Sequence, residues 1–292
     1  MIAAAAASTF LVSVHDYDLD ATLSSGQAFR WRRDGNNWEG VIGERWVRLT
    51  PEPAGIRAFA AESCTEWSWL THYLQSEIVL DDILKTFPKD LPLSESVAAC
   101  RGLRLLRQEP WECLASFICS STKQIVQIQQ IIDLICQRFG KPLSLPNQTA
   151  RGFGFPSAAQ IAGSSEAELR SCKMGFRAPY VRAAAQAIVA GELDLESVRS
   201  LPYQEARNAL TQLPGVGEKI ANCVLLFAFG FPEAFPVDVW IMKALRQLYF
   251  PKRRPTPARL RRFVASYFGP HAGYAQQYLF HFMRTRRRVN VS

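Results

Sequence analysis

The sequence predicts an α+β protein in which an N-terminal antiparallel β domain precedes a mainly α-helical domain. In the first 60 or so residues, apolar and polar residues alternate between short turn signals, as in half-buried strands. From about residue 65 the apolar residues recur three or four positions apart, which is typical of amphipathic helices. Because strands come first and helices follow, we expect a β domain with flanking helices over residues 1–95 and a helical domain over 96–292.

The predicted strands lie between recognisable turns. Residues 27–33 alternate, with Phe29 and Trp31 expected on one face. Asp34-Gly35 is a strong hairpin signal, and Gly43-Glu44 offers a second two-residue turn. Further strands are therefore predicted over residues 38–42, 46–49 and 55–61.

The clearest helix covers residues 125–139, where isoleucines and Phe139 recur at helical spacing and the pattern stops at Gly140, a glycine C-cap. Residues 141–156 are rich in proline, glycine and polar residues, and predict a loop. Other helices are predicted over residues 110–119, 178–190, 203–210, 218–229, 239–250, 256–268 and 272–283.

Charge points to a polyanionic partner. Lys and Arg number 34 against 26 Asp and Glu, a formal net charge of +8. The apolar start at residues 3–7 is too short for a signal peptide, and residues 220–232, the longest apolar stretch, are too few to cross a bilayer. We therefore expect no membrane association.

The seven cysteines are odd in number, lie mostly in apolar runs and include no C-x-x-C pair. That pattern suggests neither a zinc site nor a disulfide framework. We expect reduced core cysteines in an intracellular protein, with no metal site and no cofactor.

Residues 213–219 read L-P-G-V-G-E-K between two predicted helices. Two glycines two positions apart allow a tight turn and a close approach of the backbone to a ligand, and the N–H groups that open the next helix suit a phosphate. An ordinary αα-hairpin is the alternative. The full string favours DNA backbone binding through Gly215, Val216 and Gly217.

Lys219 contradicts local rules, because a helix N-terminus prefers an acid and the helix that follows is apolar nearly all round. Both effects are expected to lower the pKa of the lysine and favour a nucleophilic neutral amine; the alternative is a solvated first-turn lysine. Asp238, nineteen residues on, is a carboxylate in an apolar run. It suits an N-cap, which is compatible with a catalytic role beside Lys219.

Residues 213–241 resemble the signature of the helix-hairpin-helix, Gly-Pro-Asp superfamily of DNA glycosylases, and most closely its 8-oxoguanine DNA glycosylase family. Three further matches follow the family's order, so the resemblance covers nearly the whole chain. They lie at residues 25–31, at residues 104–110 with 117–121, and at residues 269–276.

The resemblance implies a bifunctional glycosylase and AP lyase that acts as a monomer on double-stranded DNA containing oxidised guanine. The damaged nucleotide is flipped out of the helix. Lys219 attacks C1′, expels the base and forms a Schiff base, after which β-elimination nicks the strand. Asp238 helps to deprotonate the lysine and stabilises the cationic sugar.

The same resemblance implies a base pocket. The Gly26 carbonyl would accept the N7 hydrogen that 8-oxoguanine has and guanine lacks, Cys223 and Phe280 would sandwich the base, and Gln276 would bind its Watson–Crick edge. The alternatives are a turn role for Gly26 and plain core packing for Phe280.

The chain also departs from the family pattern of animals. Thr122 begins the segment that replaces an asparagine run, Gln127 replaces an arginine that faces the orphaned cytosine, and Phe176 replaces a tyrosine wedge before a matching Arg177. Trp240 stands at an expected histidine and Met283 at an expected acid. Fewer donors would face the cytosine, so we expect a weak preference for the opposite base; Phe176 can still wedge between bases.

Three alternatives stay open. A 3-methyladenine-type glycosylase would lack a lysine at position 219, and an endonuclease III-like or adenine glycosylase would carry a C-terminal cysteine cluster, whereas the last cysteine is Cys223. A non-catalytic helix-hairpin-helix protein would bind DNA without needing Lys219 and Asp238. The basic segments 252–254, 259–262 and 284–288 suit such a binder equally well, or form a solvated charged face.

Overall fold

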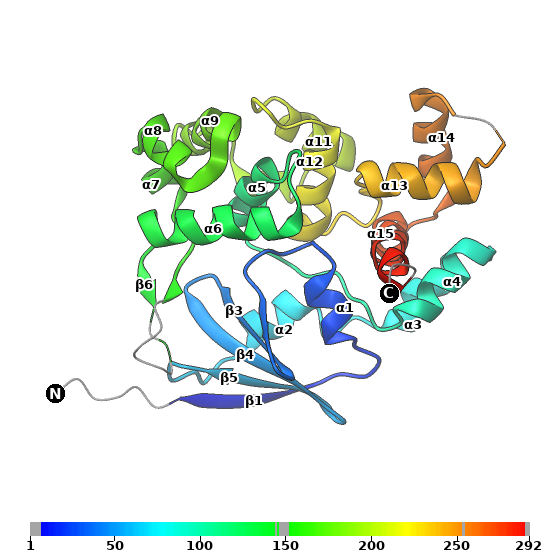
Figure 1. Cartoon of the computed structure of the whole chain (residues 1–292), viewed down its shortest axis with the longest axis horizontal. Helices are drawn as coiled ribbons and strands as arrows, with labels where there is room; N and C mark the ends of the chain where they lie inside the picture. The colour runs from blue at the N-terminus through cyan, green and yellow to red at the C-terminus, as the bar shows by residue number, and fades with distance from the viewer. Residues whose placement is uncertain (1–6, 144, 146–151, 253–254, 290–292) are drawn as a thin grey trace.

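The computed structural model describes residues 7–143, 145, 152–252 and 255–289 and confirms the predicted α+β class. An antiparallel five-stranded sheet of order β1-β5-β4-β3-β2 lies on one side of a larger helical region (Figure 1). The strands are β1 Ser8–Ser13, β2 Arg32–Asp34, β3 Asn37–Ile42, β4 Arg45–Glu52 and β5 Gly55–Ala60.

Helices make up most of the remaining chain. Around the sheet and at its junction with the helical region lie α1 Leu19–Ser24, α2 Ser68–Leu74, α3 Leu80–Leu84 and α4 Leu91–Ala99. The helical region holds α5 Pro110–Cys119, α6 Ile125–Phe139, α7 Ala158–Ala162, α8 Glu166–Leu169, α9 Ala178–Val189, α10 Leu195–Val198, α11 Tyr203–Thr211, α12 Glu218–Val224, α13 Val239–Ala244, α14 Pro257–Tyr267 and α15 Ala272–Val289.

Several helices continue through wider or tighter turns. The π-helical turns Leu225–Phe229 and Leu245–Tyr249 extend α12 and α13, so the predicted ranges 218–229 and 239–250 each hold one continuous helical segment. A π turn, Arg170–Met174, and a 3₁₀ turn, Gly175–Arg177, connect α8 to α9. The predicted loop at 141–156 contains a small ribbon of β6 Pro142–Leu143 and β7 Gly152–Phe153; residues 144 and 146–151 lie outside the described part.

The strand predicted over residues 27–33 is wrong for its first five residues, since only Arg32–Asp34 pair in the sheet. Phe29 and Trp31 do not share a face: Phe29 packs in the helical core and Trp31 in the sheet core. The backbone between them passes from one core to the other. The alternation of apolar and polar residues here therefore reflects burial in two different cores, not one buried face of a strand. Helix α1, just before this segment, was also missed.

Turn chemistry is mostly as expected. Gly43-Glu44 joins β3 and β4, while the β2–β3 turn is shifted by one residue to Gly35-Asn36 because Asp34 pairs with Asn37. Gly140 ends α6, but in extended backbone rather than in the left-handed conformation of a glycine cap. A Cβ at Gly140 would collide with the Gly154 carbonyl, so close backbone approach explains this glycine.

Two hydrophobic cores divide the molecule. The sheet and α2 share one core, whereas Leu80 of α3, Leu93 of α4 and Phe87 of the loop between them belong to the large helical core. By their packing, α3 and α4 thus belong with the helical region. The predicted domain boundary between residues 95 and 96 stays a prediction.

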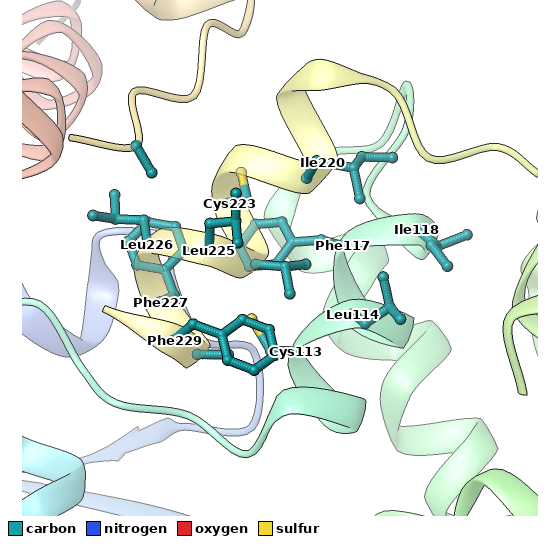
Figure 2. Close-up of a cluster of buried hydrophobic side chains, with 14 of the residues drawn as sticks. Cys113, Leu114, Phe117, Ile118, Ile220, Cys223, Leu225, Leu226, Phe227 and Phe229 are labelled. Carbon is teal, nitrogen blue, oxygen red and sulfur yellow. The ribbon is translucent and has the colours of Figure 1, made fainter. Parts of the chain in front are cut away.

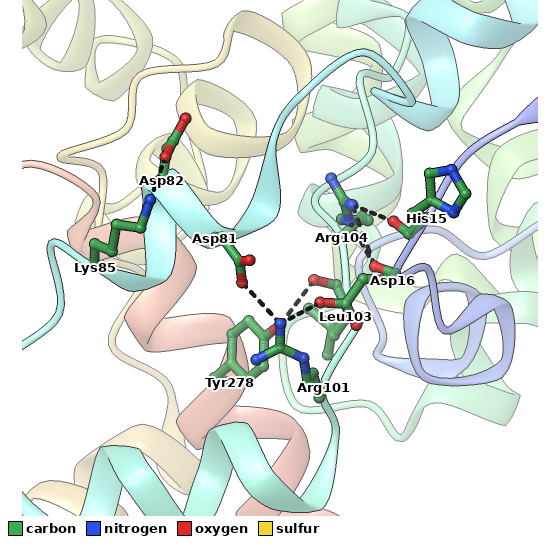
Figure 3. A network of polar contacts seen from close by, with 9 residues as sticks. All are labelled: His15, Asp16, Asp81, Asp82, Lys85, Arg101, Leu103, Arg104 and Tyr278. Carbon is green, nitrogen blue, oxygen red and sulfur yellow. Dashed lines mark hydrogen bonds and ion pairs between the residues drawn. The ribbon is translucent and has the colours of Figure 1, made fainter.

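Polar contacts of Arg104, which is buried, and of Arg101, which is exposed, hold the loop between β1 and α1 (Figure 3). The Arg104 side chain is 2% exposed, and its guanidinium donates to the main-chain carbonyls of His15 and Asp16 at 3.1 and 3.2 Å. Arg101 forms ion pairs of 2.7 Å with both Asp16 and Asp81. The loop at residues 15 and 16 is therefore tied to the segment that carries Arg101 and Arg104.

Candidate active site

A small cavity of about 50 Å³ lies where α5, α12 and α15 meet the loops that carry Gly26 and Asp238. Its lining includes all six residues predicted for catalysis and base recognition: Lys219, Asp238, Gly26, Cys223, Gln276 and Phe280. Phe117, Phe227, Pro236 and Gln277 complete the wall. A larger cavity of about 450 Å³ beside Arg107 contains neither Lys219 nor Asp238, so size alone would not identify the site.

Lys219 stands at the edge of a buried helix. From Ile220 to Phe229 every residue of α12 and its π-helical extension is buried, as the apolar sequence predicts (Figure 2). Lys219 itself is half-buried, its Nζ donating to Ser120 Oγ at 3.0 Å and lying 5.2 Å from the centroid of the Phe117 ring. The amine is thus held against an aromatic wall of the cavity.

Ser120 is a site residue that the sequence reasoning missed. Its hydroxyl donates to the Phe117 carbonyl at 2.6 Å, so an oxygen lone pair is left to accept an N–H from Lys219. Ser120 belongs to the predicted motif at residues 117–121, and its position at the end of α5 was the available signal. The hydrogen bond to Ser120 uses one N–H of Lys219 Nζ and leaves the remaining positions on this nitrogen free to face the cavity.

Asp238 caps α13, as its sequence position predicts. Its Oδ1 accepts the backbone N–H of Trp240 at 3.0 Å and of Ile241 at 2.8 Å. Burial raises the pKa of Asp238 above its usual value, against the opposing effects of these backbone N–H groups and of the Lys219 charge. Capping therefore leaves the carboxylate in the cavity wall, near a cation.

Cys223 is 3% exposed, and burial raises the pKa of its thiol to about 11. The Lys219 charge opposes this rise and the Asp238 charge adds to it. Lysine, thiol and carboxylate are therefore close enough to influence one another. Lys219 and Asp238, nineteen residues apart in the sequence, therefore lie in the same site, as predicted.

Gly26 needs to be glycine. Its φ is +76°, and a Cβ there would lie 2.7 Å from Ile125 Cδ1 and 3.5 Å from Phe280 Cε1. The neighbouring amide of Gln27, which is fully buried, donates to the Arg104 carbonyl at 2.8 Å and accepts from Leu106 N–H at 2.8 Å. The Gln277 amide, directly after the predicted motif at residues 269–276, also donates to the Ser25 carbonyl at 3.0 Å. The Gly26 loop is therefore fixed both by the motif at 104–110 and by α15.

Gln276 and Phe280 face the cavity from α15. Gln276 is 3% exposed, and within the described residues its Oε1 has no hydrogen-bond partner. Buried polar atoms without partners are rare and costly, so the position calls for a donor from a ligand. Phe280 packs against the helical core but keeps an accessible surface in the cavity, unlike a plain core residue.

A second group of predicted residues surrounds the turn that follows α5. Phe176 is 52% exposed, and the Arg177 guanidinium lies 4.2 Å from its ring centroid. Phe176 also packs edge-on against Tyr180, with ring centroids 6.4 Å apart, and Tyr180 lies where a Cβ on Gly215 would be. The exposed aromatic ring is therefore connected to the predicted hairpin.

The donors of Arg177 are largely occupied. This side chain is buried and donates to the carbonyls of Ser121 and Met174 and, at 2.7 Å, to Thr122 Oγ1. Thr122 is exposed with a φ of +55°, and the exposed Gln127 uses its Oε1 to accept the Gln124 N–H at 3.0 Å. The protein itself therefore already satisfies much of this group's hydrogen-bonding capacity.

The hairpin has the expected geometry. Gly215 has a φ of +78° and Val216 is buried beneath the turn. Gly217 precedes α12 and has open space where a Cβ would lie. The exposed backbone of this turn is accessible to a ligand.

Trp240 does not line the small cavity. It packs against Met283, Phe282 and Ala244, and Lys243 Nζ lies 6.0 Å from its ring centroid. The two positions where the resemblance led us to expect a histidine and an acid thus hold an apolar contact. In the part of the chain that the structure describes, no three His, Cys, Asp or Glu side chains are grouped as metal ligands. No helix within the described ranges is long and apolar enough to span a membrane.

Comparisons with known proteins agree with this geometry. Residues 9–114 match the family "8-oxoguanine DNA glycosylase, N-terminal domain", and residues 115–270 match "HhH-GPD superfamily base excision DNA repair protein". The N-glycosylase/DNA lyase OGG1 of Arabidopsis thaliana is 33% identical, with 90% of this chain and 76% of that protein covered. A probable N-glycosylase/DNA lyase of Methanothermobacter thermautotrophicus is 31% identical over 94% and 95% of the two chains.

Among solved structures, the 8-oxoguanine glycosylase/lyase of Clostridium acetobutylicum, in complex with double-stranded DNA containing cytosine opposite 8-oxoguanine, superimposes with a TM-score of 0.87. It is 32% identical, and 93% of each chain is covered. Sequence motifs, cavity lining and relatives agree, and the chain belongs to the 8-oxoguanine DNA glycosylase family of the HhH-GPD superfamily of base excision DNA repair proteins.

Proposed function

We propose that this protein is a bifunctional DNA glycosylase and AP lyase that excises 8-oxoguanine from duplex DNA in base excision repair. The observation that carries the proposal is the convergence of Lys219, Asp238 and the unsatisfied Gln276 on one largely apolar cavity. A pure DNA binder needs neither the amine nor the carboxylate there. A 3-methyladenine-type enzyme does not need the amine.

The chemistry begins at the amine of Lys219. Its nitrogen lone pair forms a bond to C1′ of the flipped nucleotide while the C1′–N9 bond breaks, and the bonding electrons leave with the base, which takes up a proton. The carboxylate of Asp238 accepts a proton from the lysine nitrogen and stabilises the positive charge on the sugar, an effect that is strong in a dry site. Its raised pKa makes it a better proton acceptor than an ordinary aspartate.

The C1′–O4′ bond then breaks as the nitrogen lone pair forms the C=N bond, O4′ takes up a proton, and a protonated Schiff base joins Lys219 to C1′. Loss of a proton from C2′ breaks the C3′–O bond by β-elimination and nicks the strand. Ser120 supports the first step, because its hydroxyl accepts one lysine N–H and restrains the nitrogen beside the cavity. No metal is needed for any of these steps.

Base recognition uses the groups that the protein leaves unsatisfied. Gln276 is placed to bond the Watson–Crick edge, Gly26 to accept the N7 hydrogen, and Cys223 and Phe280 to stack on the two faces of the base. The cavity has room for only a few water molecules. Entry of a purine therefore requires side chains such as the partly exposed Phe280 to move.

DNA binding involves the hairpin and the group around Phe176. Gly215, Val216 and Gly217 present backbone to the phosphates, while Phe176 wedges into the stack beside Arg177. Thr122, Gln127 and Trp240 lie on the same DNA-facing side in this proposal. The enzyme works as a monomer, which sedimentation with and without DNA would check.

The decisive experiment is borohydride trapping on an 8-oxoguanine duplex. The wild-type protein should form a stable covalent complex with DNA and release the base. Lys219→Gln should lower excision by roughly 10⁴-fold or more while lesion-duplex binding is retained, because only the nucleophile is removed. Normal excision by that variant would contradict the mechanism.

A further inference from the structure

The positive charge of this protein is concentrated at one end of the sequence. After Asp238 the remaining 54 residues contain 12 Lys and Arg and no acidic residue. The first 238 residues hold the other 22 basic residues and all 26 acidic ones, a balance of −4. The net charge of +8 therefore comes entirely from the segment that begins at α13.

Lys243 and Arg246, the first two of these cations, have no ion pair among the described residues. Further along the chain, Arg286 forms a long ion pair of 3.9 Å with Glu95. Arginines of the sheet, by contrast, are paired with neighbouring acids, as Arg48 is with Glu39 at 2.6 Å. Arg253 and Arg254 of the predicted basic segments lie outside the described residues, as do the side chains of 287 and 288.

An open groove of about 570 Å³ runs along α13 and begins at the active site. Asp238 lines both this groove and the small cavity, so the groove adjoins the active site at this residue. Lys243 and Arg246 supply the cations of the groove, and Val239, which is 79% exposed, lies beside its start. Arg246 Nε is buried without a hydrogen-bond partner among the described residues, an unsatisfied donor in a groove wall.

The spacing of these cations fits a nucleic acid strand. Val239, Lys243 and Arg246 recur four and three residues apart and so share one helix face. Eight residues separate Asp238 from Arg246, or about 12 Å along the helix at about 1.5 Å per residue. That length corresponds to three to four nucleotides, at about 3.4 Å of axial rise for each phosphate of a strand.

We propose that the groove along α13 is a phosphate-binding track for duplex DNA next to the flipped nucleotide, with Lys243 and Arg246 as its cations. The inference rests on the proposed function, since it assigns the DNA segment adjoining the active site to this groove. It explains why the groove opens from Asp238 and why its cations have no acidic partners. Phosphate contacts position the DNA but carry no sequence information.

The salt dependence of DNA binding tests this track. Lys243→Gln/Arg246→Gln, compared in the excision-deficient Lys219→Gln background, should lower the slope of log K against log salt concentration by about 2, since each phosphate contact adds about 0.9. The loss should be equal on lesion-containing and undamaged duplexes. Lys89→Gln/Lys141→Gln removes two exposed lysine charges elsewhere and should leave the slope unchanged.

A slope equal to that of the parent protein would overturn the track, as would an equal decrease in the control. Lys243→Gln alone should lower the slope by about 1, which provides a test if the double variant folds poorly. Borohydride trapping at saturating DNA, with Lys219 intact, separates the two proposals. Trapping with an unchanged slope rejects only the track, whereas no trapping in the wild-type protein rejects the proposed function.

Discussion

The lesion pocket and the group around Phe176 differ in whether their polar atoms already have hydrogen-bond partners within the protein. In the pocket, Gln276 Oε1 is buried and has no partner among the described residues. Around Phe176, the guanidinium of Arg177 already donates to two carbonyls and to Thr122. A buried atom without a partner discriminates strongly between ligands, because a wrong ligand leaves it unpaired. A group that is already satisfied has little left with which to discriminate.

This contrast predicts strong discrimination between bases in the lesion pocket and weak discrimination between bases on the opposite strand. The turn at residues 120–122 connects the two, since Ser120 holds Lys219 while Ser121 and Thr122 accept from Arg177. Variants on the lesion side should therefore change rates and selectivity strongly. Changes of the base opposite the lesion should matter least.

The largest of these effects is expected for Asp238→Asn. Asparagine keeps the N-cap of α13 but cannot accept a proton or stabilise the sugar cation, so single-turnover excision should fall by about 10²- to 10⁴-fold. Because the pKa of Asp238 is raised, the wild-type rate should fall with decreasing pH at values above the usual aspartate range. Asp194→Asn, at another helix cap, is the matched control and should keep the wild-type rate.

A wild-type pH profile with no acid limb above that range would contradict the role of Asp238. So would an Asp238→Asn variant that excises at the normal rate.

Gln276→Leu should weaken selectivity for the damaged base. The variant replaces the unsatisfied amide by an apolar group of similar size, and the loss of a buried hydrogen bond to the base should cost about 1–3 kcal/mol, roughly 5- to 150-fold in kcat/KM. Binding to undamaged duplex should be unchanged. Equal kcat/KM for variant and wild type would show that the amide does not contact the base.

Ser120→Ala should reduce the rate of Schiff base formation by about 10-fold, because the amine loses the hydrogen bond that restrains it. Ser120→Thr restores a hydroxyl and should recover most of the rate, while lesion binding stays constant in both variants. Ser164→Ala removes a similar bond to a carbonyl three residues earlier and is the matched control. A slow Thr variant would point to a packing defect instead.

The smallest effect concerns the base opposite the lesion. Excision rates on duplexes with C, A, G or T opposite 8-oxoguanine should agree within about threefold, or about 0.7 kcal/mol. A larger difference would need a hydrogen bond from Arg177 to the opposite base, and its donors already bind Ser121 and Thr122. Single-turnover rates on the four duplexes measure this directly. A strong preference for cytosine would remove the contrast between the two regions.

Periodicity predicted the fold class, and local rules singled out Lys219 and Asp238, whereas the four residues of the base pocket were implied by the resemblance to the family. Periodicity reports burial on one face, and the apolar run after Lys219 could only be a buried helix, as α12 is. The segment 27–31 failed because Phe29 and Trp31 enter different cores, and alternation does not distinguish one buried face from two. Ser120 was missed because its partner lies 99 residues away in the chain, beyond the reach of local patterns.

The pocket thiol has a consequence for an enzyme that repairs oxidative damage. Peroxides react with thiolates, and a pKa of about 11 keeps Cys223 almost wholly protonated at neutral pH. Burial thus protects the sulfur that would stack on the lesion from the same oxidants that produce the lesion. The protein can keep its stacking surface chemically intact under the conditions in which its substrate accumulates.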